Sequence, residues 1–296
     1  MSVLATETAP SALQGRSIPD IWKPLLVSSL LLGLLFAPAL AKMVQEWIDL
    51  EEMGHGFFVP VVAGWIVWTE RDRLKSLELK PSYFGIVLVV FGFVQYLLAY
   101  VGAEMFLQRT AFLLSFAGIL WTLGGWTLVR ALLFPLFLLT FMVRWPSIVY
   151  QQVTFPLQLL ASRLAEYLLD VMNVPVLRDG NVLELANKRL SVVEACSGIR
   201  SLLSLSFLSL VFGYFFDNKA WMRWVLLLAT IPIALLANAG RVTITAWLWE
   251  NAPDIAAGIF HTIEGWIIFM IALLALVVTH QAINAMYDRW RVRKQG

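Results

Sequence analysis

Apolar runs, many of them about 20 residues long, recur along the chain and are separated by short polar segments. A helix needs about 20 apolar residues to cross roughly 30 Å of hydrocarbon. Each run therefore predicts a membrane-spanning helix, about eight in all. The predicted spans are residues 24–41, 56–68, 83–101, 110–129, 131–143, 197–216, 221–249 and 260–283.

The segment between the fifth and sixth predicted spans begins with a helical pattern. Residues 153–172 place Leu160, Leu164, Tyr167 and Leu168 on one face at helical spacing, with charged residues elsewhere on the wheel. This arrangement is typical of an amphipathic helix that lies on a membrane surface.

The second half of that segment, residues 174–195, has a β pattern instead. Its short β-prone runs are separated by turn residues at Asp179-Gly180 and Asn187-Lys188, which predicts a small hairpin or three-strand ribbon leading to Cys196. The fold class is therefore an all-α polytopic membrane protein with a small extracytoplasmic helix and β-ribbon at 146–196.

Composition and charge agree with this class. Hydrophobic residues make up 59% of the chain and charged residues 14%, whereas soluble domains carry about 25% charged residues. The mean hydropathy is +0.75. No stripe of Lys and Arg interleaved with aromatic residues indicates nucleic-acid binding.

The distribution of positive charge predicts the orientation in the membrane. Lys and Arg concentrate in residues 70–80, 217–223 and 288–296, whereas loops on the other side such as residues 101–108 and 250–258 contain almost none. Because cytoplasmic loops carry the excess of Lys and Arg, both the tail at 1–23 and the basic tail at 286–296 are predicted to be cytoplasmic. Residues 24–285 then form one transmembrane domain.

Cys196 is the single cysteine of the chain, which excludes an intrachain disulfide and a Cys-rich metal site. It precedes the sixth predicted span on the extracytoplasmic side. Unpaired N–H groups and the helix dipole at such a position favour the thiolate form. Arg200 follows one turn later.

Two further polar residues fall at the same predicted depth. Arg241 lies 19 residues after Met222, or about 28 Å along a helix, and Asn238 shares its face. His261 opens the eighth span at the same boundary, whereas His280 lies 19 residues further on, at the cytoplasmic side.

A thiol, a guanidinium and an imidazole in one layer suit acyl transfer. A thiolate attacks a carbonyl, an imidazole moves the proton, and a fixed cation stabilises the tetrahedral oxyanion. The structural alternative is that Cys196 is a small packing residue and that Arg241 and Asn238 snorkel or cap a helix. A metal site built from His261, Glu264 and Cys196 is not predicted, since no helix shows paired ligand spacing.

The motifs "VVEACSGIRSL", "NAGRVTITAW" and "FHTIEGWIIF", in this order and at outer span ends, resemble the exosortase/archaeosortase family. Upstream, "GHGFFVPVVAGWIVWTERDR" and the stretch from "FPLFLLTFMVRWP" to "LDVMNVPV" resemble the same family. The resemblance covers most of residues 50–283.

This resemblance implies a cysteine transpeptidase of the bacterial inner membrane that cleaves PEP-CTERM sorting signals. These signals consist of a Pro-Glu-Pro motif, a transmembrane helix and a basic tail. By motif, Cys196 is the nucleophile that forms a thioester, His261 the general base and acid, and Arg241 the transition-state stabiliser. The implied partners are the substrate proteins and the lipid bilayer, with an acceptor that resolves the thioester and no cofactor.

Four other residues receive secondary roles in this interpretation. Asn238 orients Arg241 or the substrate, and Arg200 and Glu194 help to bind the signal. Arg200 serves equally well in contacts with the helix and with lipid headgroups. His55, in a family-like motif, lies on the extracytoplasmic side.

Two functions from other classes also fit the pattern. A non-enzymatic subunit of an exopolysaccharide synthesis or export assembly would use the polar trio for helix packing. A membrane acyl or glycosyl transferase would use His261 and Glu264 without the thiol.

Overall fold

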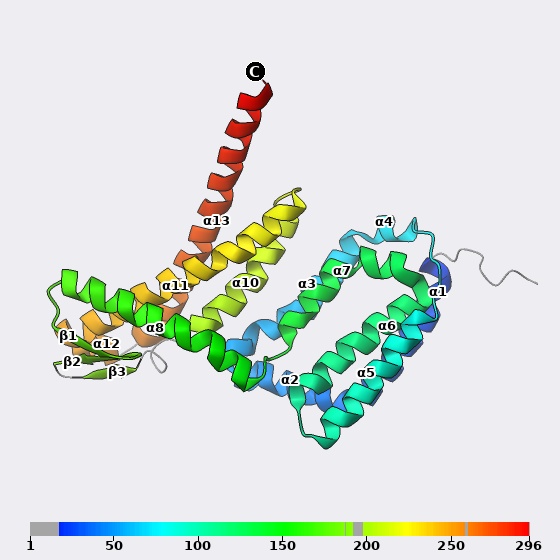
Figure 1. The fold of residues 1–296 in the computed structure, drawn as a ribbon, viewed down its shortest axis with the longest axis horizontal. Helices are drawn as coiled ribbons and strands as arrows, with labels where there is room; N and C mark the ends of the chain where they lie inside the picture. Colours follow the sequence, from blue (N-terminus) through cyan, green and yellow to red (C-terminus); the bar gives the residue numbers. More distant parts are fainter. Residues whose placement is uncertain (1–17, 187, 192–197, 258–259, 296) are drawn as a thin grey trace, which may run out of the picture. The chain divides into compact units, whose positions relative to one another are not determined.

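The computed structural model describes residues 18–186, 188–191, 198–257 and 260–295. The chain divides into two compact units, Met1–Arg144 and Trp145–Gly296. The first unit contains α1 (Ile18–Leu35), α2 (Ala37–Asp49), η1 (Glu51–Phe57), α3 (Phe58–Thr69), α4 (Arg71–Lys75), α5 (Phe84–Val101), α6 (Met105–Ala131), α7 (Leu133–Leu139) and η2 (Thr140–Met142). The second contains α8 (Ser147–Val171), β1 (Val176–Asp179), β2 (Val182–Leu185), β3 (Arg189–Ser191), α10 (Gly198–Phe215), α11 (Ala220–Asn251), α12 (Pro253–Ala257) and α13 (Phe260–Gln295) (Figure 1).

The first predicted span is a bent pair of helices. Between α1 and α2 the chain turns by 76°, and Pro38 lies in the first turn of α2. Proline is accepted in the first turn of a helix but removes a hydrogen bond from a helix interior, so a new helix begins where α1 ends. In α2, Ala39, Met43 and Trp47 are buried at helical spacing.

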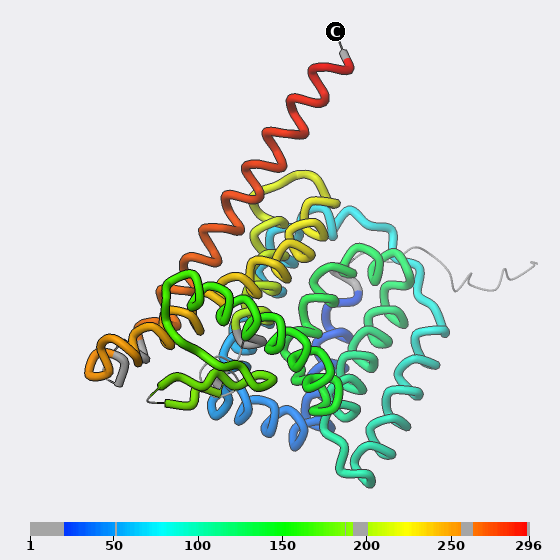
Figure 2. The backbone as a smooth tube through the Cα atoms, turned by 60° about the vertical axis from the view of Figure 1, so that its left-hand side comes forward, coloured from blue at the N-terminus to red at the C-terminus, as the bar shows by residue number. Residues whose placement is uncertain are grey.

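Glycines bring α5 and α6 into close contact along their lengths (Figures 1 and 2). A Cβ atom on Gly85 would overlap the backbone of Thr122, and one on Gly118 would lie 2.8 Å from the backbone nitrogen of Val89. Small residues at such positions allow helix backbones to approach closely within membranes. This pair is the most extensively packed part of the first unit.

By length and composition, four helices of the described chain can cross a membrane: Phe84–Val101, Met105–Ala131, Ala220–Asn251 and Ile263–Lys294. The number rises to six if each of two broken helix pairs counts as one span. This is fewer than the eight spans predicted. The two predicted spans that the larger count leaves out are α3, which has only 12 residues, and α10, whose fully described part, Ser201–Phe215, is shorter than a membrane span. The protein is nevertheless a helical membrane protein with several apolar helices.

In the second unit, α10 and α11 form an antiparallel pair, and α13 packs against α11 (Figures 1 and 2). Apolar side chains from all three helices meet in one buried cluster: Leu205, Met222, Leu226, Ala234, Ala272 and Leu276. Helix α11 has 32 residues and continues through Pro232. The three helices whose sequences carry the family-like motifs are thus packed into one body.

Between α8 and α10 lies a three-stranded antiparallel sheet in the order β1-β2-β3. Asp179 pairs with Val182, so Gly180 and Asn181 form a two-residue turn, and Gly180 adopts a positive φ of 61°, as such hairpin turns require. The sheet occupies the stretch in which the sequence predicts a hairpin or ribbon.

Helix α8 has two distinct faces. Ala161, Ala165 and Leu169 are fully buried, and α8 packs against α11 and β1. Of the apolar residues predicted to face a membrane surface, Leu160, Tyr167 and Leu168 are exposed, and Leu164 is half-buried. An exposed apolar face on a helix is what an interfacial helix would present to lipid.

Candidate active site

Arg241 lies on α11, one helical turn after Asn238. The Arg241 side chain is 17% exposed, and Asn238 is buried. The Nε atom of Arg241 is buried and has no hydrogen-bond partner within the described part of the chain. Val242, the next residue, is fully buried in the cluster that joins α11, α8 and the sheet.

The contact to Arg241 comes from Glu264, near the start of α13. Glu264 is only 3% exposed, and its Oε1 atom lies 3.8 Å from Arg241 Nε. Thr245, one turn after Arg241 on α11, donates a hydrogen bond of 2.5 Å to the same carboxylate oxygen. The Thr245 hydroxyl also lies 2.9 Å from the carbonyl oxygen of Arg241.

The other predicted catalytic residues are placed only in part. Cys196 and Glu194 lie outside the described residues, between β3 and α10. Arg200 is in the first turn of α10 and His261 in the first turn of α13, and their side chains also lie outside the described part. The structure therefore brings the Arg241 turn of α11 to the beginning of α13, the helix that carries His261.

His55 belongs to the first unit, in η1. Its Nε2 atom donates a hydrogen bond of 3.1 Å to the carbonyl oxygen of Phe141, because a carbonyl can only accept. Burial lowers the pKa of His55 below its usual 6.5, and backbone hydrogen bonds oppose that effect in part. His55 thus has a backbone partner in η2, 86 residues further along the chain.

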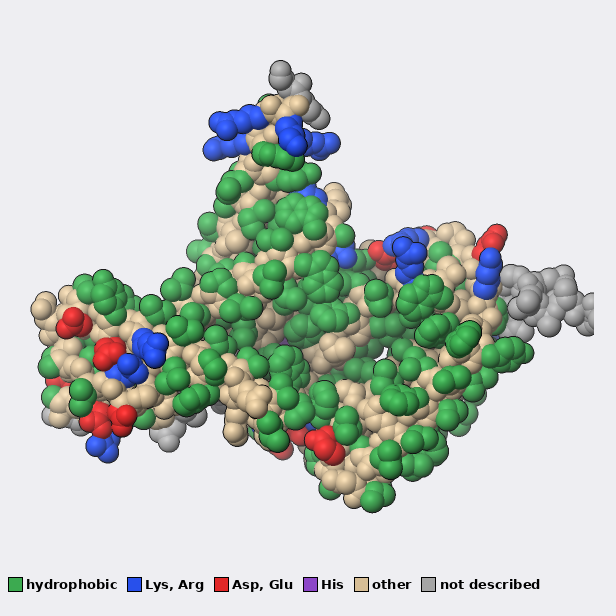
Figure 3. Space-filling view, in the orientation of Figure 1, with side chains coloured by type: hydrophobic (Ala, Val, Ile, Leu, Met, Phe, Trp, Pro, Cys, Tyr) green, Lys and Arg blue, Asp and Glu red, His purple; other side chains and the backbone are tan. Residues whose placement is uncertain are grey.

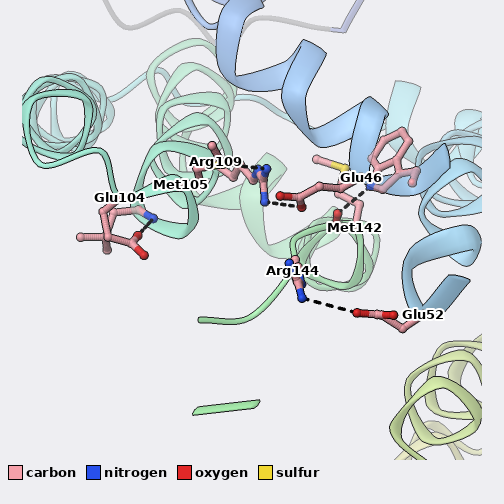
Figure 4. A network of polar contacts seen from close by, with 9 residues as sticks. Glu46, Glu52, Glu104, Met105, Arg109, Met142 and Arg144 are labelled. Carbon is pink, nitrogen blue, oxygen red and sulfur yellow. Dashed lines mark hydrogen bonds and ion pairs between the residues drawn. The ribbon is translucent and has the colours of Figure 1, made fainter. Parts of the chain in front are cut away.

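Two ion pairs of the first unit join residues that are far apart in sequence (Figure 4). Arg109 of α6 is buried and pairs with Glu46 of α2 at 2.8 Å. Arg144 pairs with Glu52 of η1 at 3.5 Å. The partners are 63 and 92 residues apart in sequence, which is why sequence reasoning missed them.

A second polar cluster lies at the other end of α13. His280 Nε2 lies 2.9 Å from Asp217 Oδ2, and Asn284 donates to the same oxygen at 2.9 Å. The backbone N–H of Lys219 donates to Asp217 Oδ1 at 2.7 Å, and Lys219 Nζ donates to Asn284. The imidazole of His280 therefore interacts with Asp217, away from Arg241, and the sequence predicts this separation.

The described residues offer no group of three His, Cys, Asp or Glu side chains that would hold a metal ion. Asn238 makes no hydrogen bond to Arg241 in the described part, so its orienting role stays a prediction. Glu264 and Thr245 are the residues that sequence reasoning did not assign to Arg241. Their spacing is a usable signal, since Thr245 follows Arg241 by one turn and Glu264 follows His261 by one turn.

The fold and this cluster define a polytopic helical membrane protein with polar residues placed where two apolar helices meet. A family model described as transmembrane exosortase matches residues 47–278, and the chain belongs to that family. This range includes all three predicted catalytic residues. Neither the comparison with curated proteins nor the comparison with solved structures gave a match.

Proposed function

We propose that this exosortase is a membrane cysteine transpeptidase that cleaves carboxy-terminal sorting signals of the PEP-CTERM type. Its substrates are exported proteins that end in a Pro-Glu-Pro motif, a transmembrane helix and a basic tail. Cys196 is the nucleophile, His261 the general base and acid, and Arg241 the stabiliser of the oxyanion. Asn238, Arg200 and Glu194 contribute to orientation and signal binding.

The reaction proceeds through a thioester. The Cys196 sulfur attacks the scissile carbonyl carbon after its proton moves to His261, and Arg241 donates hydrogen bonds to the tetrahedral oxyanion. The C–N bond then breaks, and the leaving amine takes the proton from His261. A nucleophile of the acceptor, or water, attacks the thioester and returns a proton through His261 to Cys196.

One observation carries the proposal: the contact between Arg241 and Glu264. Glu264 lies one helical turn after His261 on α13, so the contact joins the Arg241 turn of α11 to the helix turn that follows His261. The strand before Cys196 supports the same arrangement. Leu190 of β3 belongs to the buried cluster that contains Val242, the residue after Arg241.

The charge distribution supports an extracytoplasmic site in a bacterial inner membrane. Lys and Arg gather on the last turns of α13, where they are exposed (Figure 3). Cytoplasmic segments carry such clusters, and α13, at 36 residues, extends about 54 Å. The end of α13 that carries His261 then lies on the opposite side, and both termini are cytoplasmic.

The test is co-expression of the full chain with a reporter that ends in such a sorting signal. Cys196→Ala and Cys196→Ser are expected to abolish processing, because no other group supplies the nucleophile, and both variants should accumulate like the wild type. The wild type alone should form a hydroxylamine-labile adduct with the reporter. Reporter size and adduct are measured by gel electrophoresis.

The alternatives give different results in the same experiment. Unchanged processing in Cys196→Ala, together with loss in His261→Ala, would favour an acyl or glycosyl transferase that uses His261 and Glu264. Reporter processing that is absent even with the wild type, with no adduct, would favour a non-enzymatic subunit of an exopolysaccharide assembly.

A further inference from the structure

Burying the carboxylate of Glu264 at its position costs free energy. Glu264 is an acidic side chain with 3% exposure, and it comes directly before the long apolar run of α13. Desolvating a carboxylate costs several kcal/mol, which only close partners offset. Simple packing of α13 on α11 would be served by an apolar residue of the same size, so the carboxylate needs another reason to be there.

Two contacts of Glu264 reach the Arg241 turn of α11. Its Oε1 atom is 3.8 Å from the guanidinium Nε of Arg241. The same oxygen accepts from Thr245, whose hydroxyl also reaches the carbonyl oxygen of Arg241 at 2.9 Å. The single hydroxyl proton of Thr245 is shared between these two acceptors, so Glu264 contacts the side chain of Arg241 directly and its backbone only through this shared donor.

The neighbouring residue leaves room for this arrangement. Gly265 stands beside the guanidinium, and a Cβ atom placed on it would lie 4.0 Å from Arg241 Nη1. This is an ordinary van der Waals distance, so the position shows how closely α13 approaches the guanidinium of Arg241. Glu264 and Gly265 thus place the start of α13 directly beside Arg241.

We propose that Glu264 is a positioning residue for Arg241, acting directly through the ion pair and indirectly through Thr245. By the same contacts it sets the register between the Arg241 turn of α11 and the His261 turn of α13. The inference rests on the proposed function, in which Arg241 meets the oxyanion. The 3.8 Å separation orients the guanidinium by charge and leaves its N–H donors for the reacting carbonyl.

The experiment measures kcat and KM for reporter cleavage by the full-length protein in membranes. Glu264→Gln removes the charge and is expected to lower kcat about 100-fold, since a displacement of about 1 Å in a catalytic group costs about that factor. KM should change little, because the substrate does not contact Glu264. Asp254→Asn, which removes an exposed carboxylate on α12, is the matched control and should behave as the wild type.

A second pair of variants addresses folding. Thr245→Val removes the hydroxyl bridge and leaves the carboxylate in place, and it should lower kcat about 10-fold, the size of one lost hydrogen bond of about 1.4 kcal/mol. Thr245→Ser retains the hydroxyl and should restore the wild-type rate. If Glu264→Gln does not accumulate in the membrane, this pair decides the question.

Combining Glu264→Gln with Arg241→Lys distinguishes a role of Glu264 in positioning Arg241 from a purely structural role. If Glu264 acts through Arg241, Glu264→Gln should add little to the defect of Arg241→Lys, whereas independent effects would multiply. Cys196-dependent processing with Glu264→Gln and Thr245→Val near the wild-type rate would overturn the positioning role alone. Processing that does not require Cys196 would overturn the proposed function instead.

Discussion

The second unit contains two buried carboxylates, Asp217 and Glu264, each of which needs partners that offset the loss of water. Asp217 accepts hydrogen bonds from three donors, and this arrangement satisfies the buried carboxylate. Glu264 accepts from the Thr245 hydroxyl and lies 3.8 Å from the guanidinium Nε of Arg241. That Nε atom has no hydrogen bond in the described part of the chain, so the contact between Glu264 and Arg241 acts through charge.

At the scale of one residue, the lowered pKa of His55 predicts how the stability of the protein depends on pH. Because the pKa of folded His55 lies below its usual 6.5, the unfolded chain binds more protons between the two pKa values. The free energy of unfolding should therefore fall as the pH falls through that window. His55→Gln should lose about 1 kcal/mol at pH 7.5 through the weakened bond to Phe141. Thermal unfolding in detergent micelles at pH 7.5 and pH 5 measures both effects.

The decisive quantity is the difference in stability between the wild type and His55→Gln. It should be larger at pH 7.5 than at pH 5, since the wild type loses the contribution of neutral His55 in acid. A difference that grows towards pH 5 would contradict the burial of a neutral imidazole at this position.

At the scale of the element, α13 is attached to the α10–α11 pair at two places. Glu264 contacts α11 near the start of the helix, and His280 and Asn284 hold Asp217 and Lys219 further along. Between these two places, Ala272 and Leu276 of α13 pack in the buried apolar cluster of the second unit. Both polar attachments are therefore expected to determine the register of α13.

Asp217→Asn tests the second attachment. The pKa of Asp217 lies below its usual 3.8: burial alone would raise it, but hydrogen bonds from Asn284, Lys219 and His280 and the charge of Lys219 outweigh that effect. The substitution should cost about 2 kcal/mol of stability, the scale of hydrogen bonds to a charged group. Thermal unfolding measures the loss, and Asp288→Asn, an exposed carboxylate on α13, serves as the control.

The pH dependence of this effect has a definite sign. A carboxylate with a lowered pKa contributes its full stability above about pH 3.8 and loses it as the pH falls through the folded pKa. The difference between wild type and Asp217→Asn should thus be constant from pH 8 to pH 5. A difference that disappears already near pH 6 would show that Asp217 is not the titrating group.

At the scale of the whole molecule, the single native cysteine allows a direct test of orientation. In a Cys196→Ser background, Asp179→Cys in the sheet should react with a membrane-impermeant maleimide added to cells with a permeabilised outer membrane. Lys294→Cys, at the basic end of α13, should react only after the inner membrane is opened, because clusters of Lys and Arg remain cytoplasmic. Labelling is read by gel mobility.

The Cys196→Ser protein without an introduced cysteine provides the blank for the labelling measurement. Equal labelling of both positions from one side would contradict the proposed orientation and the extracytoplasmic active site. The result also tests the number of crossings between the sheet and the C-terminal tail, which must be odd if the two lie on opposite sides.

Local patterns of the sequence determined the class of protein and the family. Transfer into lipid depends on the composition of each segment, so apolar runs identified α5, α6, α11 and α13 as membrane helices. The Gly180 turn is equally local, because its backbone conformation favours glycine, and β-prone residues flank it. The motifs around Cys196, Arg241 and His261 lie within the range that the exosortase family model matches.

Contacts between elements were decided only by the tertiary structure. The pairing of Arg241 with Glu264 and of Asp217 with His280 depends on how α13 lies against its neighbours, and the second pair is separated by 63 residues. Hydropathy measures how well a segment suits lipid, but side-chain partners are chosen by the register of packed helices, which no single segment encodes.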